Sequence, residues 1–158
     1  DGTVTTVFTG VGISNGLAWS PDGTRLYYID TPTQRVDVMD YDVATGGVGE
    51  RAPLVHVAEG EGFPDGMTVD AEGGLWVAFW DGGCVRRYDP DGVLLRTVAL
   101  PVDRVTSCTF GGADLDRLFV TTASTGLDDA RRAAQPLAGA IFAVDPGVRG
   151  TPLSRFAG

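Results

Sequence analysis

The feature that most constrains this chain is a unit of four short apolar segments that occurs three times in its 158 residues. Each copy starts with a run of small apolar residues and passes through a Gly/Asp turn into a run of larger ones. Two further runs follow. Short apolar runs bounded by turn residues are typical of β-strands. The expected strands are residues 16–20, 25–30, 35–42 and 53–57, then 66–70, 75–80, 84–90 and 93–100, and last 106–110, 117–124, 139–145 and 153–158.

The three copies can be aligned at their first strand. The segment that begins at Asn15 aligns with the segment that begins at Asp65, 50 residues later, and with the segment at Thr106, a further 41 residues along. A four-stranded unit that repeats every ~40 to 50 residues indicates β-propeller blades. We therefore predict an all-β fold, a β-propeller of which this chain forms three four-stranded blades. A β-sandwich would explain short strands, but not the repeated unit.

Three blades do not close a ring, because propellers have about four to eight. Residues 1–10 also read as a further strand that already belongs to a fold. We therefore expect residues 1–158 to be part of one propeller domain. N-terminal blades of a longer chain, or a second copy, would complete the ring and cover its strand edges.

The charge and the motifs exclude several classes of function. A net charge of -9, from 21 acidic residues and 12 arginines, argues against nucleic acid and anionic membrane as partners. The single histidine, His56, and the lack of a Gly-x-Ser-x-Gly motif give serine hydrolase chemistry no support. Cys84 and Cys108 are 24 residues apart without a CxxC motif, so we expect two reduced, partly buried thiols.

Three Pro-Asp-Gly triplets occur in the chain, at Asp22, Asp65 and Asp91. Asp22 and Asp91 fall between expected strands of one blade, where Asp-Gly makes a hairpin turn. Asp65 instead precedes an innermost strand, at the position that Asn15 holds one blade earlier. An amide oxygen and a carboxylate at one mouth of the channel can bind a hard cation such as Ca²⁺ or Mg²⁺. The alternative is that both residues only cap turns.

Four segments carry a resemblance to a known family: "ISNGLAWSPDGTRLYYIDT", "FPDGMTVDAEGGLWVAFWDGG", "LPVDRVTSCTFGGADLDRLFVTTA" and "QPLAGAIFAVDPGVRGTPLSRFAG". In order and over nearly the whole chain they resemble the C-terminal half of the SMP-30/gluconolactonase/LRE (regucalcin-like) family. The resemblance implies a six-bladed propeller with one divalent cation at the channel mouth. It implies Asn15 and Asp65 as metal ligands, and Asp65 as the base that activates water for hydrolysis of a sugar lactone. Ca²⁺ is the expected ion, with Zn²⁺, Mn²⁺ and Mg²⁺ as alternatives.

The resemblance also implies that part of the site is absent from this sequence. The family's Glu ligand has no counterpart, because the similar letters "AEGEGF" at residues 58–63 fall in a loop between blades. The substrate-contacting Arg and second Asn of the early blades are missing as well. The 158 residues are therefore expected to be an incomplete enzyme.

Secondary site candidates and other functions remain open. Thr106 and Ser107 share the alignment of Asn15 and Asp65, and Trp80 could shape the rim, so all three are candidates for substrate binding. Trp80 could equally pack within its blade. The alternatives to a lactonase are a non-catalytic Ca²⁺-binding propeller and a related metal-dependent esterase or phosphotriesterase. We expect a cytoplasmic protein.

Overall fold

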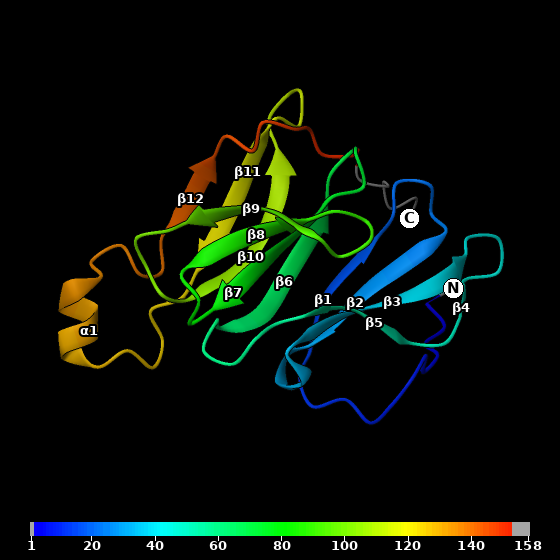
Figure 1. The fold of residues 1–158 in the computed structure, drawn as a ribbon, viewed down its shortest axis with the longest axis horizontal. Helices are drawn as coiled ribbons and strands as arrows, with labels where there is room; N and C mark the ends of the chain where they lie inside the picture. The colour runs from blue at the N-terminus through cyan, green and yellow to red at the C-terminus, as the bar shows by residue number, and fades with distance from the viewer. Residues whose placement is uncertain (1, 153–158) are drawn as a thin grey trace.

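The computed structural model describes residues 2–152, which form three antiparallel sheets (Figure 1). In the first sheet β1, β2 and β3 pair in sequence, and β4 and β5 both pair with β3. The second sheet has the order β6-β7-β8-β9, and the third has the order β10-β11-β12. The strands are β1 (Ser14–Trp19), β2 (Arg25–Asp30), β3 (Arg35–Asp42), β4 (Gly47–Val48), β5 (Ala52–His56), β6 (Phe63–Val69), β7 (Leu75–Trp80), β8 (Cys84–Tyr88), β9 (Leu94–Ala99), β10 (Val105–Gly111), β11 (Arg117–Thr122) and β12 (Ile141–Val144).

Strand β7 shows why the sheets stack like blades. Its apolar run is continuous, but successive side chains of a strand point to opposite faces. Leu75, Val77 and Phe79 pack with the first sheet, whereas Trp76 and Ala78 pack with the third. A strand that is buried on both faces needs no polar side, and this explains the sequence "LWVAFW". The second sheet is thus held between its two neighbours.

The predicted β-propeller is confirmed, with sheets that differ in detail from the expected four strands. The first sheet gains the two-residue strand β4, and the last expected strand, residues 153–158, lies outside the described residues. The prediction of a strand in residues 1–10 is wrong for residues 2–10, which form none. Phe8 instead packs edge-on against Tyr28, with 4.9 Å between ring centroids, and so covers the first sheet without pairing with a strand.

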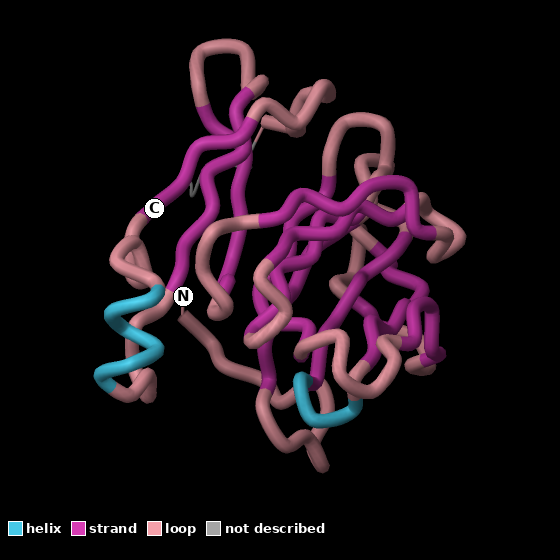
Figure 2. Tube along the Cα trace, turned by 60° about the vertical axis from the view of Figure 1, so that its left-hand side comes forward, coloured by secondary structure: helices cyan, strands magenta, loops and turns pink. Residues whose placement is uncertain are grey.

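Two short helices lie at one end of the molecule. They are η1 (Thr31–Thr33), which follows β2, and α1 (Asp129–Ala134), which lies between β11 and β12. Both are at the lower end of Figure 1, where β1, β6 and β10 begin, and the tube in Figure 2 places both in the lower half as well. No helix of residues 2–152 is long and apolar enough to cross a membrane.

Candidate functional site

Asn15, Asp65 and Thr106 occupy equivalent places in the three innermost strands. The pairing of β1 with β2 shifts around Asn15, that of β6 with β7 shifts around Asp65, and that of β10 with β11 shifts around Thr106. Such register shifts are produced by β-bulges, which re-aim a side chain and often lie next to functional sites. The structure therefore places all three within the first residues of their strands, whereas the sequence suggested that Asn15 and Asp65 precede theirs.

Gly16 and Gly66 follow Asn15 and Asp65 and allow neighbouring innermost strands to approach closely. A Cβ on Gly16 would lie 2.7 Å from the backbone oxygen of Asp65, and a Cβ on Gly66 would lie 2.8 Å from that of Thr106. Both separations are much shorter than an ordinary contact of about 3.5 Å. The lack of a Cβ at each glycine thus allows its strand to lie close to the next one. Strand β6 contacts both β1 and β10.

Thr31, the first residue of η1, orients the side chain of Asn15. Asn15 Nδ2 donates a hydrogen bond to Thr31 Oγ1 over 3.2 Å, and Thr31 Oγ1 donates one to the carbonyl oxygen of Pro64 over 2.9 Å. These two bonds link the first blade to the second beside Asp65. The amide nitrogen of Asn15 therefore faces Thr31, and the amide oxygen points away from that hydroxyl.

Asp65 is a half-buried carboxylate, and no ion pair within residues 2–152 includes it. Burial raises the pKa of Asp65, and a hydrogen bond from the Asn15 side chain lowers it by less. A carboxylate without a cationic partner, next to an amide side chain, is of the chemical type that Ca²⁺ and Mg²⁺ prefer as ligands. The same residues contain no group of three or more His, Cys, Asp or Glu that could hold a metal. The role of Asn15 and Asp65 as metal ligands therefore stays a prediction.

The three candidates for substrate binding lie near this pair in different settings. Thr106 Oγ1 is 2.7 Å from Thr121 Oγ1, so the two hydroxyls share one hydrogen bond. Ser107 packs against the second blade at the glycine that follows Asp65. Trp80 lies at the end of β7, and the guanidinium of Arg104 lies 4.7 Å from its ring centroid. One face of Trp80 is therefore covered by a side chain that the sequence did not indicate, and a substrate role for any of the three stays a prediction.

The other residues that the sequence assigned to turns or edges are where they were expected. Asp22 lies in the β1–β2 hairpin, where Ser20 and Thr24 donate hydrogen bonds to its carboxylate and lower its pKa. Asp91 lies in the β8–β9 hairpin. His56 is exposed on β5, at the edge of the first sheet. None of the three lies on an innermost strand.

Residues 58–62 lie in the loop between β5 and β6, as the sequence predicted, whereas Phe63 already belongs to β6. Glu61 in this loop accepts a hydrogen bond from Arg86 Nη1 over 2.8 Å and forms an ion pair with it. Its carboxylate is therefore engaged on the outer strands of the second blade. That the "AEGEGF" segment supplies no metal ligand stays a prediction.

Comparison with known proteins then assigns the chain to a family. Residues 1–124 match the family model described as the SMP-30/Gluconolactonase/LRE-like region. The chain belongs to the SMP-30/gluconolactonase/LRE family. Regucalcin from Gallus gallus is 47% identical over 160 residues, which cover 100% of this chain and 54% of the relative. Pentonolactonase XacC from Haloferax volcanii is 46% identical over 156 residues, which cover 96% of this chain and 54% of the relative.

A solved structure of the SMP-30/gluconolactonase/LRE family has the same fold. The structure described as a calcium-binding protein, regucalcin, from Agrobacterium tumefaciens has a TM-score of 0.89 and 36% sequence identity. The match covers 98% of this chain and 54% of that chain. The chain thus spans about half the length of the family members that it matches.

Proposed function

We propose that this chain supplies half of the active site of a divalent-cation-dependent enzyme that hydrolyses sugar lactones. The observation that carries the proposal is the pair of Asn15 and Asp65 on adjacent innermost strands, an oriented amide beside a half-buried carboxylate without a counter-ion. The name of one relative, a pentonolactonase, supports a lactone as substrate. The description of another as calcium-binding supports Ca²⁺ as the cation, with Zn²⁺, Mn²⁺ and Mg²⁺ as alternatives.

In this proposal Asn15 and Asp65 hold the cation through oxygen atoms. Since Ca²⁺ takes about 6–8 oxygen ligands, the other positions go to water, substrate and residues beyond this chain. A bound divalent cation polarises a carbonyl group and lowers the pKa of water. The neutral amide of Asn15 limits the negative charge around the ion, so that an uncharged lactone meets a site that is not strongly anionic.

Asp65 acts as the proton acceptor. As the oxygen of water attacks the lactone carbonyl carbon, Asp65 takes the proton that the water loses. The ring C–O bond then breaks, and Asp65 returns the proton to the leaving oxygen, so that the product is a hydroxy acid. Without the cation, burial raises the pKa of Asp65.

The test uses a protein in which this chain is joined to the blades that complete the ring. Hydrolysis of gluconolactone should require the cation and should stop on addition of a chelator. Asp65→Asn should lower kcat by about 10² or more, the usual contribution of a general base. Asp91→Asn makes the same change in another Pro-Asp-Gly triplet and should leave kcat unchanged. Activity that is indifferent to both chelator and Asp65→Asn would refute the proposal.

A second candidate is a propeller that binds Ca²⁺ without catalysis, and the calcium-binding description of the Agrobacterium tumefaciens protein favours it. Calorimetry and a substrate panel separate the two. Ca²⁺ binding that depends on Asn15 and Asp65, with no turnover of lactones, aryl esters or phosphotriesters, would support the second candidate. Turnover of esters or phosphotriesters alone would indicate the related esterase.

A cytoplasmic location stays a prediction.

We propose that a further half completes the ring around this site. The candidates are the N-terminal half of the same protein and a second copy of this chain. Support comes from the apolar side chains that the first and third sheets leave exposed. Either partner would also supply ligands to a cation that receives two from this chain.

A further inference from the structure

Residues 126–139 leave the body of the third blade and carry α1; we name them the α1 strap. The strap connects β11 to β12 and lies at the end of the molecule where β1, β6 and β10 begin (Figure 1). Figure 2 shows α1 at the same end after a 60° turn. The α1 strap therefore stands on the face of the propeller that carries Asn15 and Asp65.

Each end of the α1 strap is attached to the third blade and carries a glycine. Gly126 has a φ of 69° and Gly139 a φ of 91°, values that favour glycine over other residues. Next to the first glycine, Leu127 is 7% exposed and so anchors that end. At the other end Thr122 Oγ1 donates a hydrogen bond to the carbonyl oxygen of Ala140 over 2.7 Å and accepts one from Gly139 N over 3.1 Å.

The helix between these ends is held only by polar contacts. No residue of α1 is buried. Arg131 Nη2 donates a hydrogen bond to Asp103 Oδ2 over 2.8 Å and one to Asp81 Oδ1 over 3.3 Å. Gln135 exchanges two hydrogen bonds with Asp103, over 2.6 and 2.7 Å. Ion pairs of exposed side chains are individually weak and are screened by salt, so the two contacts of Arg131 are easily released.

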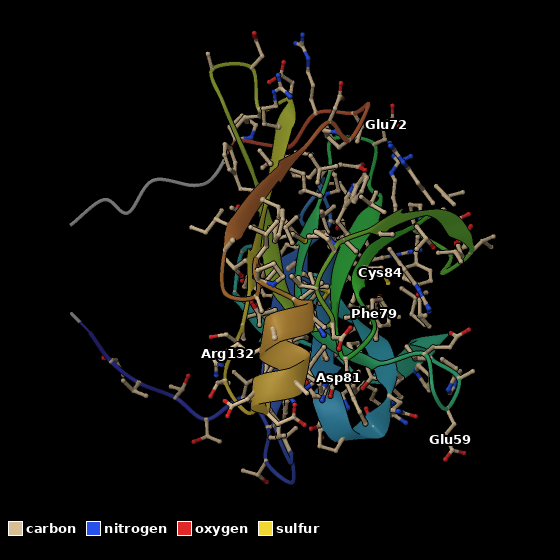
Figure 3. All side chains as sticks on the ribbon, turned by 90° about the vertical axis from the view of Figure 1, so that its left-hand side faces the viewer. Glu59, Glu72, Phe79, Asp81, Cys84 and Arg132 are labelled. Atoms are coloured by element: carbon tan, nitrogen blue, oxygen red, sulfur yellow. The ribbon has the colours of Figure 1, made fainter. Side chains whose placement is uncertain are left out.

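Arg104 belongs to the same network and is more deeply buried than Arg131. Its side chain is only 10% exposed, whereas that of Arg131 is 42% exposed. Arg104 Nε donates a hydrogen bond to Asp81 Oδ1 over 3.2 Å, and Nη1 donates one to the carbonyl oxygen of Thr125. Its guanidinium also lies over the ring of Trp80. Asp81 thus bridges a buried arginine on the body and an exposed arginine on the α1 strap, and Figure 3 shows it beside α1.

The network lies on the rim next to the candidate site. Arg104 stands two residues before Thr106 in the chain. Trp80, under Arg104, is paired with Phe63, which stands two residues before Asp65 on β6. A movement of the α1 strap would therefore act on residues that stand close to Thr106 and Asp65 along their strands.

We propose that the α1 strap is a hinged wall of the substrate mouth that limits the size of the lactones that reach Asp65. It turns on Gly126 and Gly139, and Arg131 latches it to Asp81 and Asp103. Arg104 is a positioning residue, because it holds Asp81 and the Gly126 end of the strap in place. The role as a wall rests on the proposed function, whereas the latch does not.

Hydrogen exchange tests the latch in the ring-complete protein, with two variants of the same helix. Arg131→Gln should raise amide exchange in residues 127–138 about three- to tenfold, which corresponds to the loss of one or two exposed ion pairs. A salt concentration near 1 M should raise it in the wild type, because charges are then screened within about 3 Å. Arg132→Gln removes the same charge from the other side of α1, where Arg132 contacts only the Ser124 carbonyl, and should leave exchange unchanged. Equal exchange in both variants would disprove the latch.

Kinetics with two lactones tests the wall. The ratio of kcat/KM for a disaccharide lactone, cellobionolactone, to that for a pentonolactone should rise about threefold or more in Arg131→Gln, and should not change in Arg132→Gln. The dissociation constant of the cation should be the same in both, because neither arginine forms a hydrogen bond or an ion pair with Asn15 or Asp65. If hydrogen exchange shows that the α1 strap has opened but the ratio of kcat/KM values is unchanged, the strap does not limit substrate size. If the protein binds no cation and hydrolyses no lactone, the proposed function fails and the wall with it, while hydrogen exchange still decides the latch.

Discussion

At the scale of single residues, Thr31 shows how a side chain without a role in chemistry can set the geometry of a site. Its hydroxyl accepts from Asn15 and donates to Pro64, so it fixes the amide of Asn15 relative to the strand of Asp65. We predict that Thr31→Val weakens cation binding by about 10- to 100-fold, as loss of a group that orients a metal ligand does. Calorimetric titration of the ring-complete protein with Ca²⁺ measures this.

Thr33→Val is the matched control, because Thr33 lies in the same turn and its hydroxyl donates only to the carbonyl oxygen of Asp30. It should change the cation affinity little. Equal affinity in Thr31→Val and wild type would show that the amide of Asn15 needs no such orientation.

Cys108 gives a prediction of pH dependence. The thiol is buried and free, as is that of Cys84, which confirms the expectation from the sequence. Burial raises the pKa of Cys108 to about 12, from 9.0. Since the thiolate is disfavoured only in the folded protein, the unfolding free energy should decrease as the pH rises above about 9, toward 12. Urea titrations at several pH values should show a smaller decrease in Cys108→Ala.

At the scale of elements, a substitution at Gly66 tests whether the close approach of β6 and β10 depends on a residue without a side chain. We predict that Gly66→Ala lowers the unfolding free energy by about 1–3 kcal/mol, the usual cost of overpacking, because its Cβ would meet the backbone of Thr106. Urea denaturation measures this. In Gly47→Ala the closest atom to the added Cβ would be the hydroxyl of Thr45, at 3.1 Å, at an exposed position of β4, so a much smaller effect is expected. Similar losses in the two variants would contradict the role of Gly66.

The strands could be predicted from the sequence because each is a compact apolar run between turn residues. The helix α1 could not, since six residues without a buried position show no helical period. Residues 2–10 have the composition of a strand, yet they lack a partner strand, and Phe8 packs by its ring instead. Local composition therefore identified the repeated unit well, and departures occur where packing with distant residues decides the conformation.

The same distinction holds for the candidate site. Asn15 and Asp65 could be paired from the sequence because equivalent positions of repeated blades converge on one axis. Thr31 lies within a quoted motif, but its contact with Asn15 depends on how the chain turns after β2. Arg104 over Trp80 requires side chains that are 24 residues apart in different strands and loops to meet. No spacing in the sequence indicates such contacts.

At the scale of the whole molecule, the first and third sheets leave apolar side chains uncovered. On the third sheet Phe119 is 38% exposed and Ile141 is 70% exposed, on the face away from the second sheet. On the first sheet Leu17 and Trp19 are 50% and 43% exposed. Exposed apolar patches and unpaired strand edges recruit partners or aggregate. A completing half of the propeller would cover both ends of this stack.

We therefore predict that residues 1–158 alone do not form a stable monomer of 16.5 kDa. Light scattering should show association that decreases when blades completing the ring are supplied in the same chain. The double variant Phe119→Ser/Ile141→Ser should also associate less, because it removes apolar surface from the uncovered face. Val93→Ser, which changes a residue that is 58% exposed in the hairpin of the middle blade, should associate as the wild type does.

A second copy in place of a completing half gives a different outcome. Two copies would form a discrete dimer, and two Asn15 and two Asp65 would then face one axis, which predicts one cation bound per dimer. Mass spectrometry of the intact complex, with and without Ca²⁺, separates that dimer from open-ended association. A soluble monomer of 16.5 kDa that persists at high concentration would contradict both forms of closure, because the uncovered sheets would then be stable in water without a partner.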